Sequence, residues 1–335
     1  MNEPTVTTVL TIAGSDSGGG AGIQADLKTF AALGVYGVSA ITAVTAQNTV
    51  GVAAAFALSA DLVTTQIETA ASDIRIHATK TGMLANAAIV EAVAAAIAEL
   101  ELPLVVVDPV MLAKGGDRLL DDDGVRAMSL ELLPRAMVVT PNIPEAEILS
   151  GRVITSIDDA RAAAVRIHEM GAAAVVITGG HAPGDEVVDL LFDGSAFTEF
   201  QTVRIATPHT HGSGCTFASA VAAYLAATPA TGEPIVVAAA YMDEPLRFYL
   251  GDEWNVRGYQ PGVGLARTPA PFRLVYTRPF DGDPDGRRGE RGLPQRAGHW
   301  RHRTDRRSPR RQTRKSGSVR TARRDRRHPA ASACR

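Results

Sequence analysis

The segment THGSGCTFA at 210–218 combines features that suit phosphoryl transfer. Gly212, Ser213 and Gly214 stand directly before an apolar helical pattern, so we expect their backbone amides to point toward an anion at the helix N-terminus. Cys215 follows in the first helical turn, where the pKa of a thiol is lowered and the thiolate is favoured. These residues predict a site that stabilises transferring phosphoryl oxygens. The alternative is a small buried cysteine that only helps the helix to pack.

A second glycine-rich segment, AGSDSGGGAGIQAD at 13–26, follows the first predicted strand. Glycines let backbone amides approach a ligand closely. The pattern is neither the dinucleotide-binding G-x-G-x-x-G nor the phosphate-binding G-x-x-x-x-G-K-[ST]. Four glycines between Asp16 and Asp26 favour a binding loop over a plain turn.

Two acidic positions predict a metal–nucleotide site. Asp108 ends an apolar strand, and Glu145 lies three residues after Asn142 in TPNIPE. Carboxylates in this setting can hold Mg²⁺, usually through waters, beside phosphates. A helix N-cap or a solvated loop acid is the alternative for each carboxylate. His209 and His211 are two residues apart, but no third ligand lies nearby in the sequence, so the pair does not predict a zinc site.

Apolar runs alternate with alanine-rich helical patterns, which favours βαβ units around a mostly parallel sheet with helices on both faces. The predicted strands are residues 6–12, 38–45, 76–81, 104–108, 137–140 and 174–178. The predicted helices are residues 23–33, 61–72, 85–100, 124–133, 156–170, 211–226 and 234–250. Residues 186–192 and 197–205 are predicted to form an antiparallel hairpin beside that sheet.

Ligands of such sheets bind at the carboxyl ends of the strands. Polar residues and glycines gather at these ends in Gly14-Ser15-Asp16, Gln47-Asn48, Thr81-Gly82-Met83, Asp108-Pro109-Val110 and Thr140-Pro141-Asn142. We therefore expect a single site along this edge of the sheet.

The charge of the 335 residues is divided unevenly along the chain. Residues 278–335 hold 19 of the 34 Lys and Arg but only 6 of the 36 Asp and Glu. The part from 287 onward has almost no aliphatic residues, so it cannot bury enough apolar surface to offset its ordering entropy. We predict a disordered or out-of-frame extension; a basic arm that binds nucleic acid is the alternative.

The N-terminus shows neither the basic segment nor the cleavage site of a signal peptide, and two cysteines are too few for a disulfide framework. The uncharged stretch 29–60 contains Gln, Asn, Thr and Gly, which favours buried α/β core over a membrane span. We therefore expect a cytoplasmic protein without membrane association.

These segments together resemble the hydroxymethylpyrimidine/phosphomethylpyrimidine kinases. The resemblance covers residues 6–265 through VLTIAGSDSGGGAGIQAD and its continuation at 9–52, TKTGML at 79–84, DPVMLAKGGDRLL at 108–120, TPNIPEAEIL at 140–149 and THGSGCTFASAVAAYLA at 210–226. It implies a ribokinase-like α/β domain over residues 1–265, with 266–335 as an atypical Arg-rich tail. It also implies ATP- and Mg²⁺-dependent phosphorylation of 4-amino-5-hydroxymethyl-2-methylpyrimidine, and then of its monophosphate to the diphosphate, in thiamine biosynthesis.

The resemblance carries substrate roles to Gly14, Asp26, Gln47, Met83 and Val110, which match positions that the family uses around the pyrimidine. Gln47 and Asp26 can hydrogen-bond the ring nitrogens and the exocyclic amine, while Met83 and Val110 can pack on the ring faces.

The same resemblance places Cys215 at the catalytic position. There it would help to deprotonate the hydroxymethyl group while residues 212–214 stabilise the transferring phosphoryl group. The resemblance also implies that the nucleotide and its metal lie near Asp108, Asn142 and Glu145. Mg²⁺ would be held through Asp108 and Glu145.

Three places depart from the family pattern, one of them the usual C-terminal Gly-His-Gly-Pro-like segment, which is blurred at residues 260–264. Thr178 stands where a Lys is common, and Pro245 interrupts the last helical pattern.

Pyridoxal or pyridoxamine phosphorylation is the nearest rival function, because the scaffold and phosphate site are shared; Gln47 and Met83 favour the pyrimidine. A catalytically weak ligand-binding regulator is a rival of another class, against which Cys215 and Asp108 argue. We expect a homodimer that binds the pyrimidine and ATP, with no specific nucleic-acid partner.

Overall fold

A computed structural model describes residues 6–48, 51–113, 116, 118–181, 186–204 and 210–227. Four of the features predicted above, His209, the helix at 234–250, Pro245 within it and the Arg-rich tail, lie outside the described residues.

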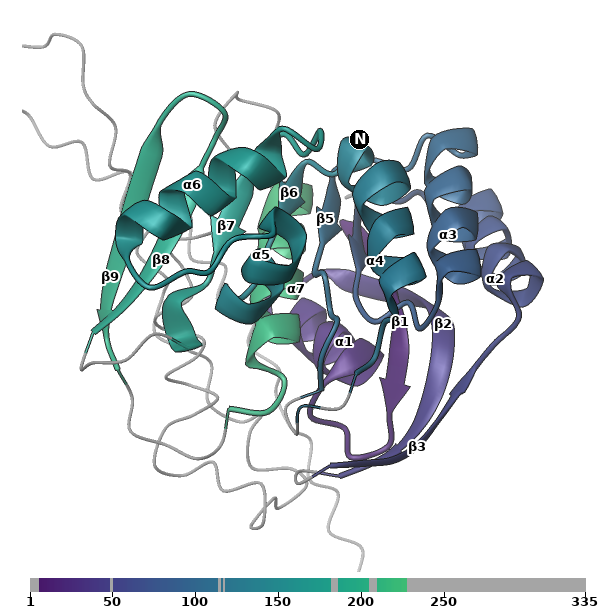
Figure 1. Cartoon of the computed structure of the whole chain (residues 1–335). Helices are drawn as coiled ribbons and strands as arrows, with labels where there is room; N and C mark the ends of the chain where they lie inside the picture. Colours follow the sequence, from purple (N-terminus) through teal and green to yellow (C-terminus); the bar gives the residue numbers. More distant parts are fainter. Residues whose placement is uncertain are drawn as a thin grey trace, which may run out of the picture. The chain divides into compact units, whose positions relative to one another are not determined.

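Nine strands form one sheet in the order β3-β2-β1-β4-β5-β6-β7-β8-β9 (Figure 1). The strands are β1 Thr8–Asp16, β2 Tyr36–Gln47, β3 Val52–Ala57, β4 Ala78–Thr81, β5 Val105–Val107, β6 Val138–Val139, β7 Val175–Ile177, β8 Glu186–Phe192 and β9 Phe197–Val203. The six strands from β2 to β7 in this order pair in parallel, whereas β3, β8 and β9 pair antiparallel. The predicted mostly parallel sheet with an adjoining hairpin is confirmed.

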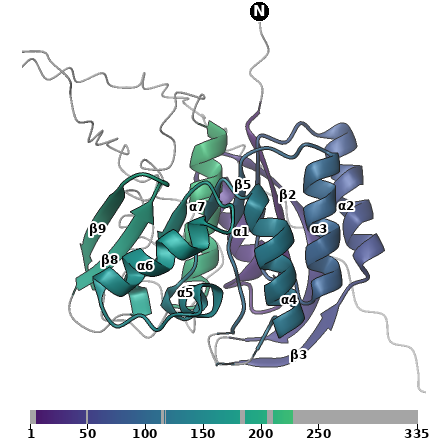
Figure 2. The same cartoon turned by 45° about the horizontal axis from the view of Figure 1, so that its top comes forward.

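Helices cover both faces of this sheet, as Figures 1 and 2 show. They are α1 Gly22–Ala32, α2 Ala60–Asp73, α3 Ala87–Glu99, α4 Asp122–Ala127, α5 Ile143–Ser150, α6 Ile157–His168 and α7 Ser213–Ala227. Successive valines of β5 face opposite cores, because side chains alternate along a strand. Val105 and Val107 pack in the core under α2 to α6, and Val106 packs with Phe217 under α1 and α7.

The structure differs from the sequence prediction in one strand boundary and in two elements that were not predicted. Strand β1 continues through Gly14 to Asp16, which pairs with Thr45, so these residues belong to a strand and not to a loop. Strand β3 was not predicted, because its alanine-rich sequence has low β-propensity. Helix α5 was not predicted either, although Asn142 and Glu145 form a capping box and Gly151 ends the helix at φ 68°.

Among the described helices, none combines the length and the apolar character that a membrane span requires.

Candidate active site

Lys80 lies at the centre of the candidate site, fully buried on β4. Its Nζ is 3.0 Å from Asp26 Oδ1 and 3.5 Å from Asp108 Oδ2. Burial disfavours the ammonium, but the nearby charges of Asp26, Cys215 and Asp108 outweigh it and raise the pKa of Lys80. Gly82 makes room for this group, because a Cβ at that position would stand 2.8 Å from Nζ. The site is therefore built around a buried cation.

Asp26 pairs with this cation, and its role as a contact of the pyrimidine ring stays a prediction. Its side chain on α1 is fully buried. Oδ1 accepts hydrogen bonds from Lys80 and from Ser219 Oγ (2.7 Å), and Oδ2 accepts one from Thr11 Oγ1 (2.6 Å). Both oxygens thus have protein donors, and Asp26 holds Lys80 in place.

Cys215 lies in the first turn of α7, as predicted, but the prediction of a lowered thiol pKa is wrong. Burial raises the pKa of Cys215 and outweighs the opposing effect of Lys80, while the carboxylates of Asp108 and Asp26 raise it further. The thiol hydrogen-bonds the Asp108 side chain, and the backbone N–H of Gly22 points to its sulfur. A helix N-terminus lowers a thiol pKa only where the thiolate is well solvated or paired, and here two carboxylates share the site.

Asp108 and Glu145 lie side by side at the carboxyl ends of β5 and β6. Asp108 is only 4% exposed, and its Oδ2 has no hydrogen-bond partner. Burial is the main cause that raises its pKa. Burial, together with the charge of Asp108, also raises the pKa of Glu145 to about 8. This oxygen faces the Lys80 ammonium at 3.5 Å but accepts no hydrogen bond, so it keeps lone pairs that could hold a hard cation such as Mg²⁺.

Glu145 also belongs to the capping box of α5, as its third residue; the N-cap itself is Asn142, so Glu145 is neither the N-cap nor the solvated loop acid of the alternative interpretation. Its Oε2 accepts the backbone N–H of Asn142 at 3.0 Å, and Asn142 Oδ1 accepts the N–H of Glu145 at 3.0 Å. Within the described ranges, no three His, Cys, Asp or Glu side chains group together in a way that could hold a metal. A cation here would therefore depend on these two carboxylates, with phosphate oxygens and water completing its ligands.

The raised pKa of Glu145 predicts how stability depends on pH. The folded protein holds the proton up to about pH 8, whereas the unfolded carboxyl loses it near pH 4.5. The free energy of unfolding therefore decreases as the pH rises between these values. We expect Glu145→Gln to flatten this decrease in melting temperatures measured from pH 5 to 8. Glu91→Gln, at an exposed position of α3, is the matched control. If the melting temperature falls equally with pH in the wild type and both variants, Glu145 is not the group responsible.

The residues predicted to surround the pyrimidine line up along the ends of four neighbouring strands. Gln47 ends β2, Gly14 lies near the end of β1, Met83 follows β4 and Val110 follows β5. A Cβ on Gly14 would stand 3.1 Å from Met83 Sδ, so the glycine leaves space for that side chain. Gln47 Oε1 accepts a hydrogen bond from Thr45 Oγ1 at 3.0 Å. The structure thus brings Gly14 and Met83 into contact and aligns the other two beside them.

The predicted anion loop, residues 212–214, lies at the N-terminus of α7. Gly212 has a φ of 80°, which requires glycine. The N–H of Ser213 donates to Thr210 O at 3.3 Å, so one of the three amides assigned to an anion closes a turn instead. Immediately before this loop, His211 Nε2 lies 2.9 Å from Asp16 Oδ2. Burial opposes ionisation of Asp16, but the hydrogen bonds from His211 and from loop amides lower its pKa.

Sequence reasoning assigned no ion-pairing role to three site residues, Lys80, Asp16 and His211. The signal for Lys80 is a single charge inside a strand whose four residues are all buried. Asp16 and His211 are 195 residues apart, so no local pattern could connect them. Thr178 pairs with Asn142.

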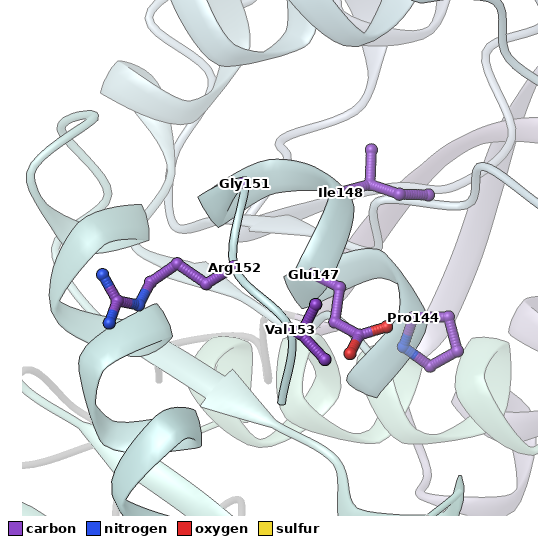
Figure 3. A pocket seen from close by; sticks show the side chains of 6 residues that line it. All are labelled: Pro144, Glu147, Ile148, Gly151, Arg152 and Val153. Atoms are coloured by element: carbon purple, nitrogen blue, oxygen red, sulfur yellow. The ribbon is translucent and has the colours of Figure 1, made fainter. Parts of the chain in front are cut away.

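A separate open pocket of about 380 Å³ lies on the outer side of α5 (Figure 3). Its lining comes from α5 and the turn that follows: Pro144, Glu147, Ile148, Gly151, Arg152 and Val153. None of the predicted site residues lines it, so it is distinct from the strand-end cluster.

Comparison with known proteins points to one family. A family model described as phosphomethylpyrimidine kinase matches residues 16–260. The hydroxymethylpyrimidine/phosphomethylpyrimidine kinase of Bacillus subtilis (strain 168) is 51% identical over 243 residues, which are 72% of this chain and 90% of that protein. The thiamine biosynthesis bifunctional protein ThiED of Geobacter sulfurreducens is 50% identical over 240 residues, 72% of this chain and 49% of that protein.

Solved structures agree with this match. Phosphomethylpyrimidine kinase from Clostridium difficile 630 superposes with a TM-score of 0.62 at 39% identity, over 71% of this chain and 99% of that one. An ADP complex of Bacillus subtilis pyridoxal kinase gives a TM-score of 0.65 at 43% identity, over 70% and 89% of the two chains. Pyridoxal kinase from Staphylococcus aureus in complex with AMP-PCP gives 0.66 at 40% identity, over 72% and 88%.

Proposed function

Because this chain belongs to the phosphomethylpyrimidine kinase family, we propose that its strand-end site transfers the γ-phosphoryl group of ATP to 4-amino-5-hydroxymethyl-2-methylpyrimidine and then to the monophosphate. The observation that carries this proposal is the position of Cys215, which contacts Asp108 and lies near Lys80 at the start of α7. A thiol, a buried cation and a helix N-terminus thus meet beside the strand ends where a small ring is expected.

Each group has a role that follows from its surroundings. Cys215 accepts the proton of the substrate hydroxyl only as a thiolate, which this step converts to a neutral thiol. Lys80 stabilises the negative charge on sulfur before the proton arrives. Backbone amides of the anion loop stabilise the transferring phosphoryl oxygens. Asp108 and Glu145 would hold Mg²⁺, which when bound neutralises phosphate charge. Gln47 and Met83 orient the pyrimidine so that its hydroxymethyl group faces Cys215.

The test is product analysis by mass. The purified chain is incubated with the hydroxymethylpyrimidine, ATP and MgCl₂, and the expected products appear in sequence, first the monophosphate and then the diphosphate. Absence of both products, from a protein whose melting temperature rises with MgATP, would contradict the proposal and favour the rival of a ligand-binding regulator.

Pyridoxal phosphorylation is the second candidate, because solved pyridoxal kinases superpose on this chain as well as the phosphomethylpyrimidine kinase does. Steady-state kcat/KM for the pyrimidine and for pyridoxal decides between them. We expect the pyrimidine to be preferred, since Gln47 offers an amide to the ring nitrogens and the amine.

Gln47→Leu is expected to weaken recognition of the pyrimidine. The leucine leaves polar atoms of the ring unpaired, at a cost of roughly 1–3 kcal/mol, which corresponds to a KM about 5- to 150-fold higher. Gln66→Leu serves as the control, because that glutamine bonds the backbone of Ile41 on the same strand, away from its carboxyl end. A KM for the pyrimidine that stays within about twofold of the wild-type value would show that the assigned pocket is wrong.

We also propose that the chain forms a homodimer through the outer side of β2 and β3. Residues 29–60 contain no charge, and Phe56 and Val44 on these paired strands are 71% and 48% exposed. An exposed apolar sheet edge of this kind favours association. The kinase domain of residues 1–265 and a cytoplasmic location remain parts of the same proposal.

Phe56→Asp is expected to convert the dimer into a folded monomer. Phe56 is mostly exposed in the isolated protomer, so its replacement should cost little folding stability. Size-exclusion chromatography with light scattering measures the mass. Leu130→Asp is the matched control, because Leu130 is similarly exposed but lies far along the chain from β2 and β3. A dimer that survives Phe56→Asp would place the interface elsewhere.

A further inference from the structure

Asp16 organises the first glycine-rich loop through a single carboxylate. This side chain at the end of β1 is only 3% exposed. Its Oδ1 accepts the N–H of Gly18 at 2.7 Å, and its Oδ2 accepts the N–H groups of Gly20 and Ala21 at 3.0 and 2.9 Å. The conformation of residues 16–21, which we call the glycine loop, therefore depends on this one group.

The glycine loop is joined to the anion loop through His211. The ring Nε2 lies 2.9 Å from the same Asp16 Oδ2. The two loops are also in close contact, since a Cβ on Gly20 would stand 2.6 Å from His211 Cδ2 and a Cβ on Gly212 would stand 1.7 Å from Gly20 O. Only glycine fits at either position, so the close contact between the two loops depends on these two glycines.

At its other side the glycine loop is joined to the substrate-facing residue Gln47. Ser17 Oγ donates to Gln47 O at 2.8 Å, and the N–H of Gln47 donates back to Ser17 Oγ at 2.8 Å. The backbone of Gln47 is thus bonded to Ser17, and the neighbouring residue Asp16 is bonded to His211, which directly precedes the anion loop.

We propose that Asp16 and His211 are a positioning pair that sets the distance between the acceptor hydroxyl and the transferring phosphoryl group, and thereby keeps water from replacing that hydroxyl. The inference rests on the proposed kinase function. Phosphoryl transfer depends mainly on alignment, and a displacement of about 1 Å can cost about 10²-fold in rate. The hydrogen bond from His211 needs only an Nε2–H, so a neutral ring suffices.

The test measures coupling, which is the amount of ADP formed per phosphorylated pyrimidine at saturating pyrimidine. His211→Phe keeps a ring but loses the donor, and His211→Gln keeps a donor of similar reach. We expect a ratio near one for the wild-type protein. For His211→Phe we expect transfer to be about 10- to 100-fold slower, on the scale of such displacements, with a ratio clearly above one. His211→Gln should restore coupling to nearly the wild-type ratio.

His77→Phe is the matched control, because His77 accepts a hydrogen bond from the N–H of Thr8 at the opposite end of β1. It should keep the wild-type ratio. If His211→Phe keeps a ratio of ADP to phosphorylated pyrimidine near one, the pair is only structural and the inference is overturned. This holds whether its transfer rate is unchanged or falls only in proportion to its melting temperature.

Hydrogen exchange of the amides at 18–21 tests the pair without any substrate. Exchange should be faster in His211→Phe and close to wild type in His211→Gln; unchanged protection in His211→Phe would overturn the inference. A wild-type protein that forms no phosphorylated pyrimidine contradicts the proposed function, while this exchange comparison still decides on the pair.

Discussion

Replacing Cys215 by alanine is expected to lower turnover by about 10²-fold or more while the KM for the pyrimidine changes little. A positioned acid–base group contributes on this scale, and its loss affects the transition state far more than the bound substrate. The hydrogen bond between the thiol and Asp108 places the sulfur at the start of α7, next to the expected phosphoryl group. Single-turnover rates with saturating ATP and pyrimidine measure the effect directly.

Cys334→Ala provides the control, because Cys334 is the only other cysteine of the chain and lies in the Arg-rich tail. It should leave turnover unchanged. If Cys215→Ala retains wild-type turnover, the cysteine contributes packing alone, as the alternative interpretation of the sequence holds.

The raised pKa of Cys215 makes the role of Lys80 more important. The thiol is protonated in the free protein, so it has to release this proton before it can accept one from the substrate. Forming that thiolate requires a group that stabilises its negative charge. Lys80 is the cation that acts on this sulfur, and burial keeps its field unscreened by solvent.

Lys80→Met is expected to destabilise the fold by about 3–5 kcal/mol, because it leaves Asp26 and Asp108 buried without their counter-ion. For a domain of this size that corresponds to a melting temperature roughly 6–20 °C lower. Calorimetry or thermal fluorescence measures the shift. A second substitution, Asp26→Asn, removes one of the uncompensated charges and should recover part of the loss.

Lys28→Met is the matched control, since the Lys28 ammonium is at the surface and donates to Gly19 O. It should melt close to the wild-type temperature. If Lys80→Met melts no lower than this control, the buried ion pairs do not hold the site together as described.

Local patterns in the sequence were sufficient for most of the fold. The hairpin strand at 186–192 was predicted with the bounds that the structure has, and the helix at 156–170 was predicted from its capping box at Ser156 and Asp159. These signals depend on residues close together in the chain, which is why they can be read without a structure. The strand ends that gather around the site follow from the parallel arrangement itself.

The same local patterns were weaker where tertiary contacts decide the conformation. Strand β3 is held by pairing with β2 despite its alanines, and β1 extends to Asp16 because Thr45 pairs with it. Helix α5 carried its own signal in Asn142 and Glu145, which were interpreted first as ligands and only second as a cap.

The electrostatics of the site were decided by the tertiary structure alone. Lys80 and Asp26 are 54 residues apart, and Asp16 and His211 are 195 apart, so their pairing depends on how the strands and helices are ordered in space. The direction of the Cys215 pKa shift depends on burial and on two carboxylates that the sequence does not place beside it. The sequence by itself determined the family, the sheet and the edge of the sheet at which we propose that the chemistry occurs. Only the folded chain decided which charges are buried together, because Coulombic and desolvation energies depend on distance and solvent exposure in space and not on separation along the chain.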